Sequence, residues 1–239
     1  MITKSSRKTN KFVILGQSRT GSSLFVDLLN SHPKIACERE IFDKRRHLFD
    51  KKVWFPYFFL RGMALREGNR FFGFKVHLYQ LTQHQKVDPN YFLSKLESRG
   101  YKIIYLRRNN FLNQALSGVI VQKRFSYHLL KNEIYKAEKI EVSIEELENK
   151  MQRRVQNQKK ELACLSGRIY HEVIYERDLE NSENHQKTCD KIFDLLGIEN
   201  VNVHTKFQKI NKKSPKEIIL NYKELSDHFK KTPFGRFFV

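Results

Sequence analysis

Short apolar runs alternate along this chain with segments whose apolar residues recur every three or four positions. The runs have the length and composition of buried strands, and they lie at 12–15, 71–77, 102–106 and 169–175. Helical spacing and helix-boundary residues follow at 22–32, 88–99, 112–120, 141–166, 185–196 and 214–231. Strands that alternate with helices predict a mainly parallel sheet covered on both faces. We therefore expect one domain over 11–239, preceded by a loose basic tail at 1–10.

Two stretches do not fit this alternation. Residues 35–42 follow the first predicted helix and are interpreted as a loop that borders the ligand crevice of an open sheet. Residues 43–70 mix basic side chains with the aromatic run 54–60. That run suits a lid, an acceptor cleft, a peripheral contact with a membrane surface, or a helix buried against the sheet. Burial is the interpretation that we favour.

A loop bounded by glycines joins the first predicted strand to the first predicted helix. It reads G-Q-S-R-T-G-S-S, from Gly16 to Ser23. Backbone N–H groups gathered at a helix start, together with the helix dipole, bind anions. The phosphate loop of nucleoside triphosphatases has a lysine where this chain has Ser22, and Arg19 supplies the positive charge instead. We expect a site for a phosphate that is not the end of a triphosphate; a plain turn is the alternative.

Further polar residues cluster where predicted strands end. Arg107 and Arg108 directly follow a strand, and Ser117 lies on the next helix, so this segment predicts a second anion site. Lys75 and His77 share one face of their strand at period two. These two residues are candidates for contacting an anion and for acid–base chemistry.

Two carboxylates follow the first predicted helix. Glu38 and Glu40 each present a group that can take a proton from a substrate hydroxyl. Two solvated loop glutamates are the alternative interpretation.

The composition narrows the class of partner. The chain has 239 residues, with 45 Lys+Arg against 26 Asp+Glu, and a formal net charge of +19. This excess predicts anionic partners. The basic residues are scattered along the chain, which weakens a nucleic-acid interpretation. Three cysteines without a C-x-x-C pair form neither a disulfide framework nor a zinc pattern, and suit a reducing cytoplasm. No apolar run reaches the ~20 residues of a membrane span.

These segments together resemble the sulfotransferases that use 3′-phosphoadenosine 5′-phosphosulfate (PAPS), especially the bacterial glycolipid and nodulation-factor types. Residues 18–24 look like the family's 5′-phosphosulfate loop, and 104–117 look like its 3′-phosphate element. Residues 173–179 with 193–197, and 209–211 with 221–225, are similar to its later segments. The resemblance implies a P-loop-like three-layer α/β/α fold with a mainly parallel central sheet.

The resemblance also implies roles for particular residues. The 5′-phosphate of the nucleotide would be held by the loop, and its 3′-phosphate by an arginine after the strand and by residues near that arginine. The residues implied to bind the nucleotide are Arg19, Thr20, Gly21, Ser22, Ser23, Leu24, Arg107, Arg108, Ser117, Tyr175, Lys209 and Asn211. Glu40 would take the proton of the acceptor hydroxyl, with Glu38 and His77 as substitutes, and Lys75 would lie near the substrate. Whether Arg107 or Arg108 binds the 3′-phosphate stays open. No metal is implied.

The function expected from the resemblance is transfer of a sulfuryl group from PAPS to a hydroxyl of a carbohydrate or glycolipid. A P-loop-like nucleotide phosphotransferase or kinase is the first alternative, although it would need a lysine in place of Ser22 and acidic magnesium ligands. A non-catalytic polyanion-binding protein is the second, suggested by the net charge. We expect a cytoplasmic protein that can meet a membrane only at its surface. The oligomeric state is not predicted.

Overall fold

A computed structural model of the protein describes residues 11–44, 52–68, 70–124, 139–207 and 214–238. Its centre is a five-stranded sheet in which every neighbouring pair is parallel. The strand order is β2-β3-β1-β4-β5. The strands are β1 (Lys11–Gly16), β2 (Ile35–Glu38), β3 (Phe71–Val76), β4 (Tyr101–Arg107) and β5 (Tyr170–Ile174). All five therefore end at the same edge of the sheet, and the segments that follow them meet there.

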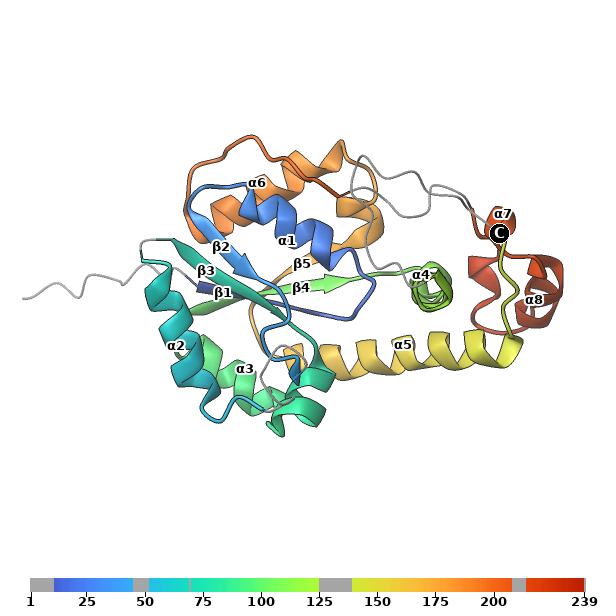
Figure 1. Ribbon diagram of the computed structural model, residues 1–239, viewed down its shortest axis with the longest axis horizontal. Coiled ribbons are helices and arrows are strands. Elements are labelled where there is room, and N and C mark those ends of the chain that lie inside the picture. Colours follow the sequence, from blue (N-terminus) through green and yellow to red (C-terminus); the bar gives the residue numbers. More distant parts are fainter. Residues whose placement is uncertain (1–10, 45–51, 69, 125–138, 208–213, 239) are drawn as a thin grey trace, which may run out of the picture.

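Helices cover both faces of the sheet, which makes a three-layer, P-loop-like α/β/α fold (Figure 1). Successive residues of β1 point to opposite faces, as the strand period requires. Phe12 and Ile14 pack with α1 (Ser22–Asn30) and α6 (Asn184–Leu196). Val13 and Leu15 pack on the other face, which is covered by α2 (Pro56–Arg66), α3 (Pro89–Glu97) and the end of α5 (Ile144–Leu165).

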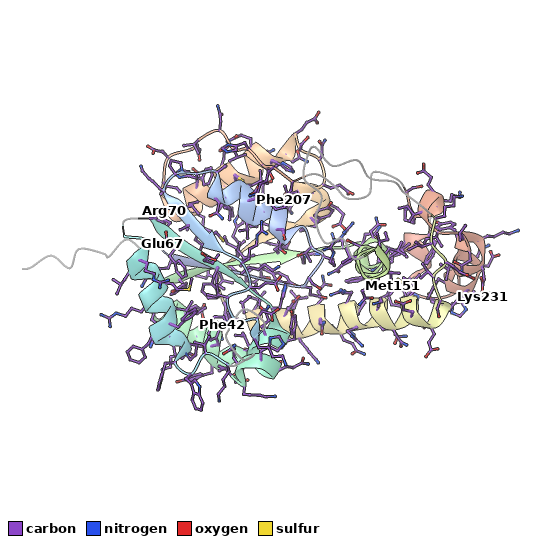
Figure 2. All side chains as sticks on the ribbon, viewed as in Figure 1. Phe42, Glu67, Arg70, Met151, Phe207 and Lys231 are labelled. Atoms are coloured by element: carbon purple, nitrogen blue, oxygen red, sulfur yellow. The ribbon has the colours of Figure 1, made fainter. Side chains whose placement is uncertain are left out.

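A third apolar cluster lies beyond the carboxyl edge of the sheet. It joins α4 (Phe111–Arg124) and the first half of α5 to α7 (Pro215–Ile218) and α8 (Tyr222–Phe229). Met151 of α5 is fully buried in it and lies between α4 and α5 (Figure 2). This cluster fixes α4 and α5 relative to the strand ends, so both helices can present side chains to that edge.

Three expectations about local structure are wrong. Part of the expected loop at 35–42 is strand β2, which pairs with β3 from Ile35 opposite Phe71. The expected helix at 214–231 is two helices, because Ile219 leaves the helix to form a bridge with Ile140. The expected burial of 54–60 holds only for one side: Leu60 is buried, whereas Trp54 and Phe58 are exposed.

The close pairing of β1 with β4 leads to a stability prediction. A Cβ at Gly16 would lie 2.1 Å from the carbonyl oxygen of Leu106, so the backbone would have to move. We expect Gly16→Ala to destabilise the fold by about 1–3 kcal/mol. Gly62 of α2 has open space around it, and Gly62→Ala should stabilise the fold by about 0.5–1 kcal/mol. Urea unfolding of both variants checks this, and equal effects would contradict it.

Candidate functional site

The loop between β1 and α1 has an unusual backbone. Arg19 has a φ of 65° and Gly21 a φ of 78°, both in the left-handed region. A glycine adopts this region without a steric cost, whereas an arginine in this region is strained. Gly21 also has no side chain to cap α1, so the first turn of that helix keeps N–H groups that intrahelical bonds do not use.

Side chains hold the four successive carbonyl groups that lead into this turn. Three of them come from other elements, namely the end of β3, the end of β4 and α4. The bonds run from His77 Nδ1 to Gly16 O, from Thr20 Oγ1 to Gln17 O (2.8 Å), from Gln114 Nε2 to Ser18 O (2.9 Å) and from Arg108 Nη1 to Arg19 O (3.4 Å). The N–H and C=O of a peptide unit point in opposite directions, so these bonds favour N–H groups turned toward the other side of the loop. A concave set of N–H groups is an anion-binding arrangement.

The loop and the β4–α4 segment meet directly. Arg19 Nε donates a hydrogen bond to Ser117 Oγ on α4 at 3.0 Å. Arg108 is 9% exposed, and its guanidinium lies 4.4 Å from the ring centroid of Tyr175. Its Nε has no hydrogen-bond acceptor among the residues that the structure describes, although Glu176 Oε1 is 3.4 Å away. The structure thus brings Arg19, Arg108 and Ser117 together at one place.

Arg107 points elsewhere. Its Nε donates to Glu172 Oε1 on β5 at 2.6 Å, and its Nη1 contacts Asn109. The start of α4 is also occupied from within the protein. The Glu176 carboxylate accepts hydrogen bonds from the backbone N–H of Asn109 at 2.9 Å and of Asn110 at 3.0 Å. This cap was not predicted from the sequence. Because Glu176 occupies the start of α4, the side chains of Arg108 and Ser117 face the loop and the helix start does not.

The other residues predicted to bind the nucleotide lie on or against the loop, as far as the structure describes them. Tyr175 begins the π-helical turn η4 (Tyr175–Leu179), and a Cβ on Gly21 would meet its ring at 2.5 Å. Thr20 and Ser22 are buried, whereas Ser23 and Leu24 are half-buried at the start of α1. Lys209 and Asn211 lie outside the described residues.

A second cluster stands at the ends of β2 and β3. Lys75 is 4% exposed, and its Nζ donates to Glu40 Oε1 at 2.6 Å. Gln80 Nε2 donates to the other carboxylate oxygen at 3.1 Å. Glu40 is partly open to solvent and lies two residues beyond Glu38, the last residue of β2. A buried ammonium and an amide thus fix the orientation of the Glu40 carboxylate.

His77 links this cluster to the loop. Its Nδ1 faces a carbonyl oxygen, that of Gly16, and must therefore carry the proton of that contact. Its Nε2 lies 3.4 Å from Glu40 Oε1 and makes no hydrogen bond within the described part of the chain. Burial and the charge of Lys75 lower the pKa of His77. A neutral His77 with its proton on Nδ1 therefore presents Nε2 as an acceptor.

The ionisation of Glu40 and Lys75 is coupled. Burial alone would raise the pKa of Glu40, but His77, whenever its imidazole is protonated, and the Lys75 ammonium outweigh burial and hold that pKa well below its usual range. Burial lowers the pKa of Lys75, while Glu40 acts in the opposite direction. Glu40 is therefore a charged but weak base as long as the ion pair is intact.

Helix α5 adds residues to this site that were not predicted from the sequence. Arg154 Nη1 donates to Ser18 Oγ at 3.1 Å, next to the left-handed turn. Glu161 is 2% exposed and accepts hydrogen bonds from Gln17 Nε2 at 3.3 Å and from Tyr105 OH at 3.1 Å. Burial raises the pKa of Glu161 to about 7. The floor of the loop thus contains a carboxyl group that titrates near neutral pH.

A signal for these residues was present in the sequence. The inward stripe of α5 runs through 147, 151, 154, 158, 161 and 165 at helical spacing. Polar residues at 154, 158 and 161 interrupt it. Leu162, the apolar neighbour of Glu161 in the sequence, lies off this stripe and is 43% exposed. Polar residues on an inward stripe tend to have partners in the protein interior, and here Arg154 and Glu161 have partners in the loop.

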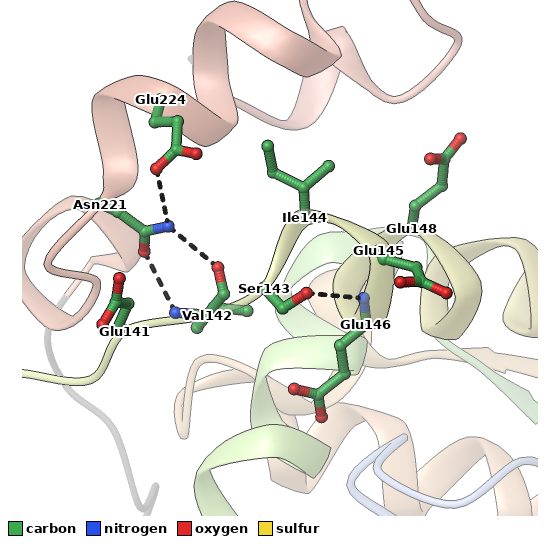
Figure 3. A pocket seen from close by; sticks show the side chains of 9 residues that line it. All are labelled: Glu141, Val142, Ser143, Ile144, Glu145, Glu146, Glu148, Asn221 and Glu224. Carbon is green, nitrogen blue, oxygen red and sulfur yellow. Dashed lines mark hydrogen bonds between the residues drawn. The ribbon is translucent and has the colours of Figure 1, made fainter.

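An open pocket of about 670 Å³ lies at the other end of α5 (Figure 3). Its lining includes five glutamates, at 141, 145, 146, 148 and 224. Asn221 joins the two sides of the pocket through its bonds to the backbone of Val142, and it also donates a hydrogen bond to Glu224 on its own side. Carboxylates repel a phosphate or sulfate, so this pocket is unsuited to the predicted anionic ligand. Among the residues described, no group of three or more His, Cys, Asp or Glu side chains is arranged to hold a metal ion.

Glu161 leads to a prediction about pH. Its pKa in the folded protein is about 7, above the value of about 4.5 that is usual for a glutamate, so the folded state binds the proton more tightly than the unfolded state. Its contribution to stability is complete below about pH 4.5 and is lost as the pH rises through about 7, on the order of 1.4 kcal/mol per pKa unit. Glu161→Gln keeps an acceptor oxygen and should flatten the dependence of the unfolding free energy on pH between 5 and 8.

Urea unfolding at several pH values measures this dependence. Glu145→Gln, which changes an exposed carboxylate on the same helix, is the matched control and should leave the slope of the wild type unchanged. A Glu161→Gln variant with the slope of the wild type would show that the carboxyl group is already ionised at pH 5.

The comparisons with known proteins include a distant structural likeness. No protein-family model matches the chain, and no curated protein matches it significantly. A crystal structure of shikimate kinase from Bacteroides thetaiotaomicron superposes with a TM-score of 0.46 at 12% sequence identity, covering 79% of this chain and 98% of that one.

Proposed function

We propose that this protein transfers a sulfuryl group from PAPS to a hydroxyl of a carbohydrate or glycolipid acceptor. The observation that carries the proposal is the meeting of two predicted anion elements at Arg19, Ser117 and Arg108. A donor with a 5′-phosphosulfate and a separate 3′-phosphate needs two anion sites within the reach of one nucleotide. The resemblance of the two segments to PAPS-dependent sulfotransferases supplies the identity of that nucleotide.

In this proposal the loop binds the 5′ end of the donor. Its carbonyl groups are held by other side chains, which favours N–H groups facing the phosphate. Ser22 stands where a triphosphate-binding loop has lysine, which fits a ligand without β- and γ-phosphates. Arg19 supplies positive charge to the oxygens that become more negative as the S–O bond breaks.

The 3′-phosphate is assigned to Arg108 and Ser117 rather than to Arg107. The buried Nε of Arg108 makes no hydrogen bond in the described part of the chain, although Glu176 Oε1 lies 3.4 Å away, and a phosphate would supply the missing acceptor. Arg107 is already paired with Glu172. Tyr175 supports the Arg108 guanidinium with its ring. Lys209 and Asn211 stay predictions of the resemblance alone.

The transfer itself needs an acceptor for one proton. The acceptor oxygen attacks the sulfur atom, the bond between sulfur and the 5′-phosphate oxygen breaks, and the hydroxyl proton moves to Glu40. The products are the sulfated acceptor and 3′,5′-ADP. Lys75 and Gln80 keep Glu40 oriented, and the His77–Gly16 contact ties this cluster to the donor loop. His77 Nε2 is the alternative proton acceptor, and Glu38 is a more distant substitute.

A nucleotide phosphotransferase is the second candidate, because a P-loop-like α/β/α fold suits it as well as it suits the first. The two differ in the ligand that the loop must hold. A kinase requires ATP with magnesium, whereas the proposed reaction releases 3′,5′-ADP. A polyanion-binding protein without activity would respond to many anions and lose binding steeply with salt.

Ligand-induced stabilisation separates these candidates. We expect 3′,5′-ADP to raise the melting temperature of the wild type, because ligand binding to the folded state stabilises it, and we expect ATP with magnesium to have little effect. Arg108→Gln should abolish the increase, and Arg107→Gln, its neighbour and matched control, should keep most of it. Stabilisation by ATP with magnesium alone would favour the kinase, and equal effects of unrelated polyanions would favour the binding protein.

Turnover tests the role of Arg19. If its guanidinium acts mainly in the transition state, Arg19→Ala should lower the rate of 3′,5′-ADP release from PAPS, with a panel of carbohydrate acceptors, by about a hundredfold or more. Arg153→Ala removes an exposed cation from α5 and is the control for a loss of overall charge. Normal turnover of Arg19→Ala would remove this residue from the mechanism.

A further inference from the structure

We propose that residues 52–66 are a docking surface for a membrane that contains anionic phospholipids. The four side chains that carry the proposal are Trp54, Phe55, Phe58 and Leu65, which are 74%, 69%, 72% and 70% exposed. All four come from α2 and the residues just before it. Soluble proteins rarely gather several large apolar side chains on one exposed segment without an interaction partner.

The segment cannot bury these side chains by rotating, because its other side is already used. Leu60 is 2% exposed within the core between α2, α3 and the sheet. Tyr57, Phe59 and Met63 pack against the same cluster. Helix α2 is therefore apolar on two sides, one against the sheet and one against solvent. A helix that is apolar all round is typical of a buried position, so its outward side favours a second apolar phase.

The charges on this surface select the kind of partner. Lys52, Arg61 and Arg66 are exposed, and residues 52–66 contain no Asp or Glu. Lys52 Nζ lies 4.9 Å from the centroid of the Trp54 ring, and Phe55 and Phe58 pack edge to face at 6.3 Å. Aromatic side chains interleaved with Lys and Arg fit the boundary between acyl chains and anionic headgroups.

Two other partners fit less well. A second copy of this chain carries the same excess of positive charge, with a formal net charge of +19 for each copy, and would be repelled. A protein partner with an acidic surface would satisfy the cations but not the four apolar side chains. No helix among the described residues is long and apolar enough to cross a membrane, so the contact that we propose is with the surface only.

Trp54 is the only tryptophan in the chain, so its fluorescence reports on this surface directly. The full-length protein is mixed with vesicles of phosphatidylcholine alone or with added phosphatidylglycerol, and followed by emission and co-sedimentation. We expect a blue shift and at least about tenfold stronger partitioning onto the anionic vesicles, because the exposed basic residues of this surface are attracted to anionic headgroups.

Matched variants separate a local contact from general charge attraction. Phe58→Asp should weaken partitioning by about tenfold or more, since it removes an apolar side chain from the interface. Ile169→Asp adds the same charge at a residue that is 93% exposed and lies outside the surface, and it should bind nearly as well as the wild type. Both substitutions are at exposed positions, so loss of folding does not confuse the comparison.

Four outcomes would overturn the proposal. They are an absence of partitioning onto either kind of vesicle, partitioning without a change in Trp54 emission, equal losses in Phe58→Asp and Ile169→Asp, and a blue shift that depends on protein concentration without vesicles. The last outcome would assign the surface to self-association. The proposal does not depend on the sulfotransferase hypothesis, because the vesicle experiment uses neither nucleotide nor acceptor.

Discussion

The geometry of this site depends on where four consecutive carbonyl groups find their hydrogen-bond donors. The chain leaves β1 at Gly16 and must reverse its course before α1, and the carbonyl groups of residues 16–19 accept hydrogen bonds from side chains there. Side chains from β3, α4 and the end of β4 hold three of them, and Thr20 holds the fourth. Buried carbonyl groups need partners, so these donors fix the loop backbone without a bound ligand. The loop is thus shaped by elements distant in sequence, and a displacement of α4 would also displace the loop.

Helix α5 supplies the second layer of this support. Arg154 contacts the side chain of Ser18, and Glu161 holds Gln17 from below, so one helix touches two successive loop residues. Its first half is fixed in the cluster with α4 and α8, and its end packs under the sheet. Because α4 and α5 share that cluster, the two helices that bond the loop are held relative to each other, which keeps Arg19 opposite Ser117.

The sequence predicts the regular parts of this protein and misses the contacts between them. Four strands were predicted because continuous apolar runs such as 102–106 indicate burial on both faces. β2 was missed because it has only four residues and pairs only with β3. The cap of α4 by Glu176 and the bonds of Arg154 and Glu161 join residues 56 or more positions apart, and local patterns do not contain that information. The loop and Arg19 were predicted because their signal lies within eight residues of sequence.

Positive charge gathers around this loop, although side chains of the protein already hold its backbone. Arg19, Arg108 and Arg154 converge on it, and burial together with the charges of Arg153 and Arg19 lowers the pKa of Arg154. Among the nearby carboxylates, Glu40 is bound by Lys75, whereas Glu176 is bound by the backbone of α4 and also lies 3.4 Å from Arg108 Nε. Glu161 favours its neutral form below about pH 7. Positive charge from three arginines is therefore gathered at one turn, which favours an anion over a cation near it.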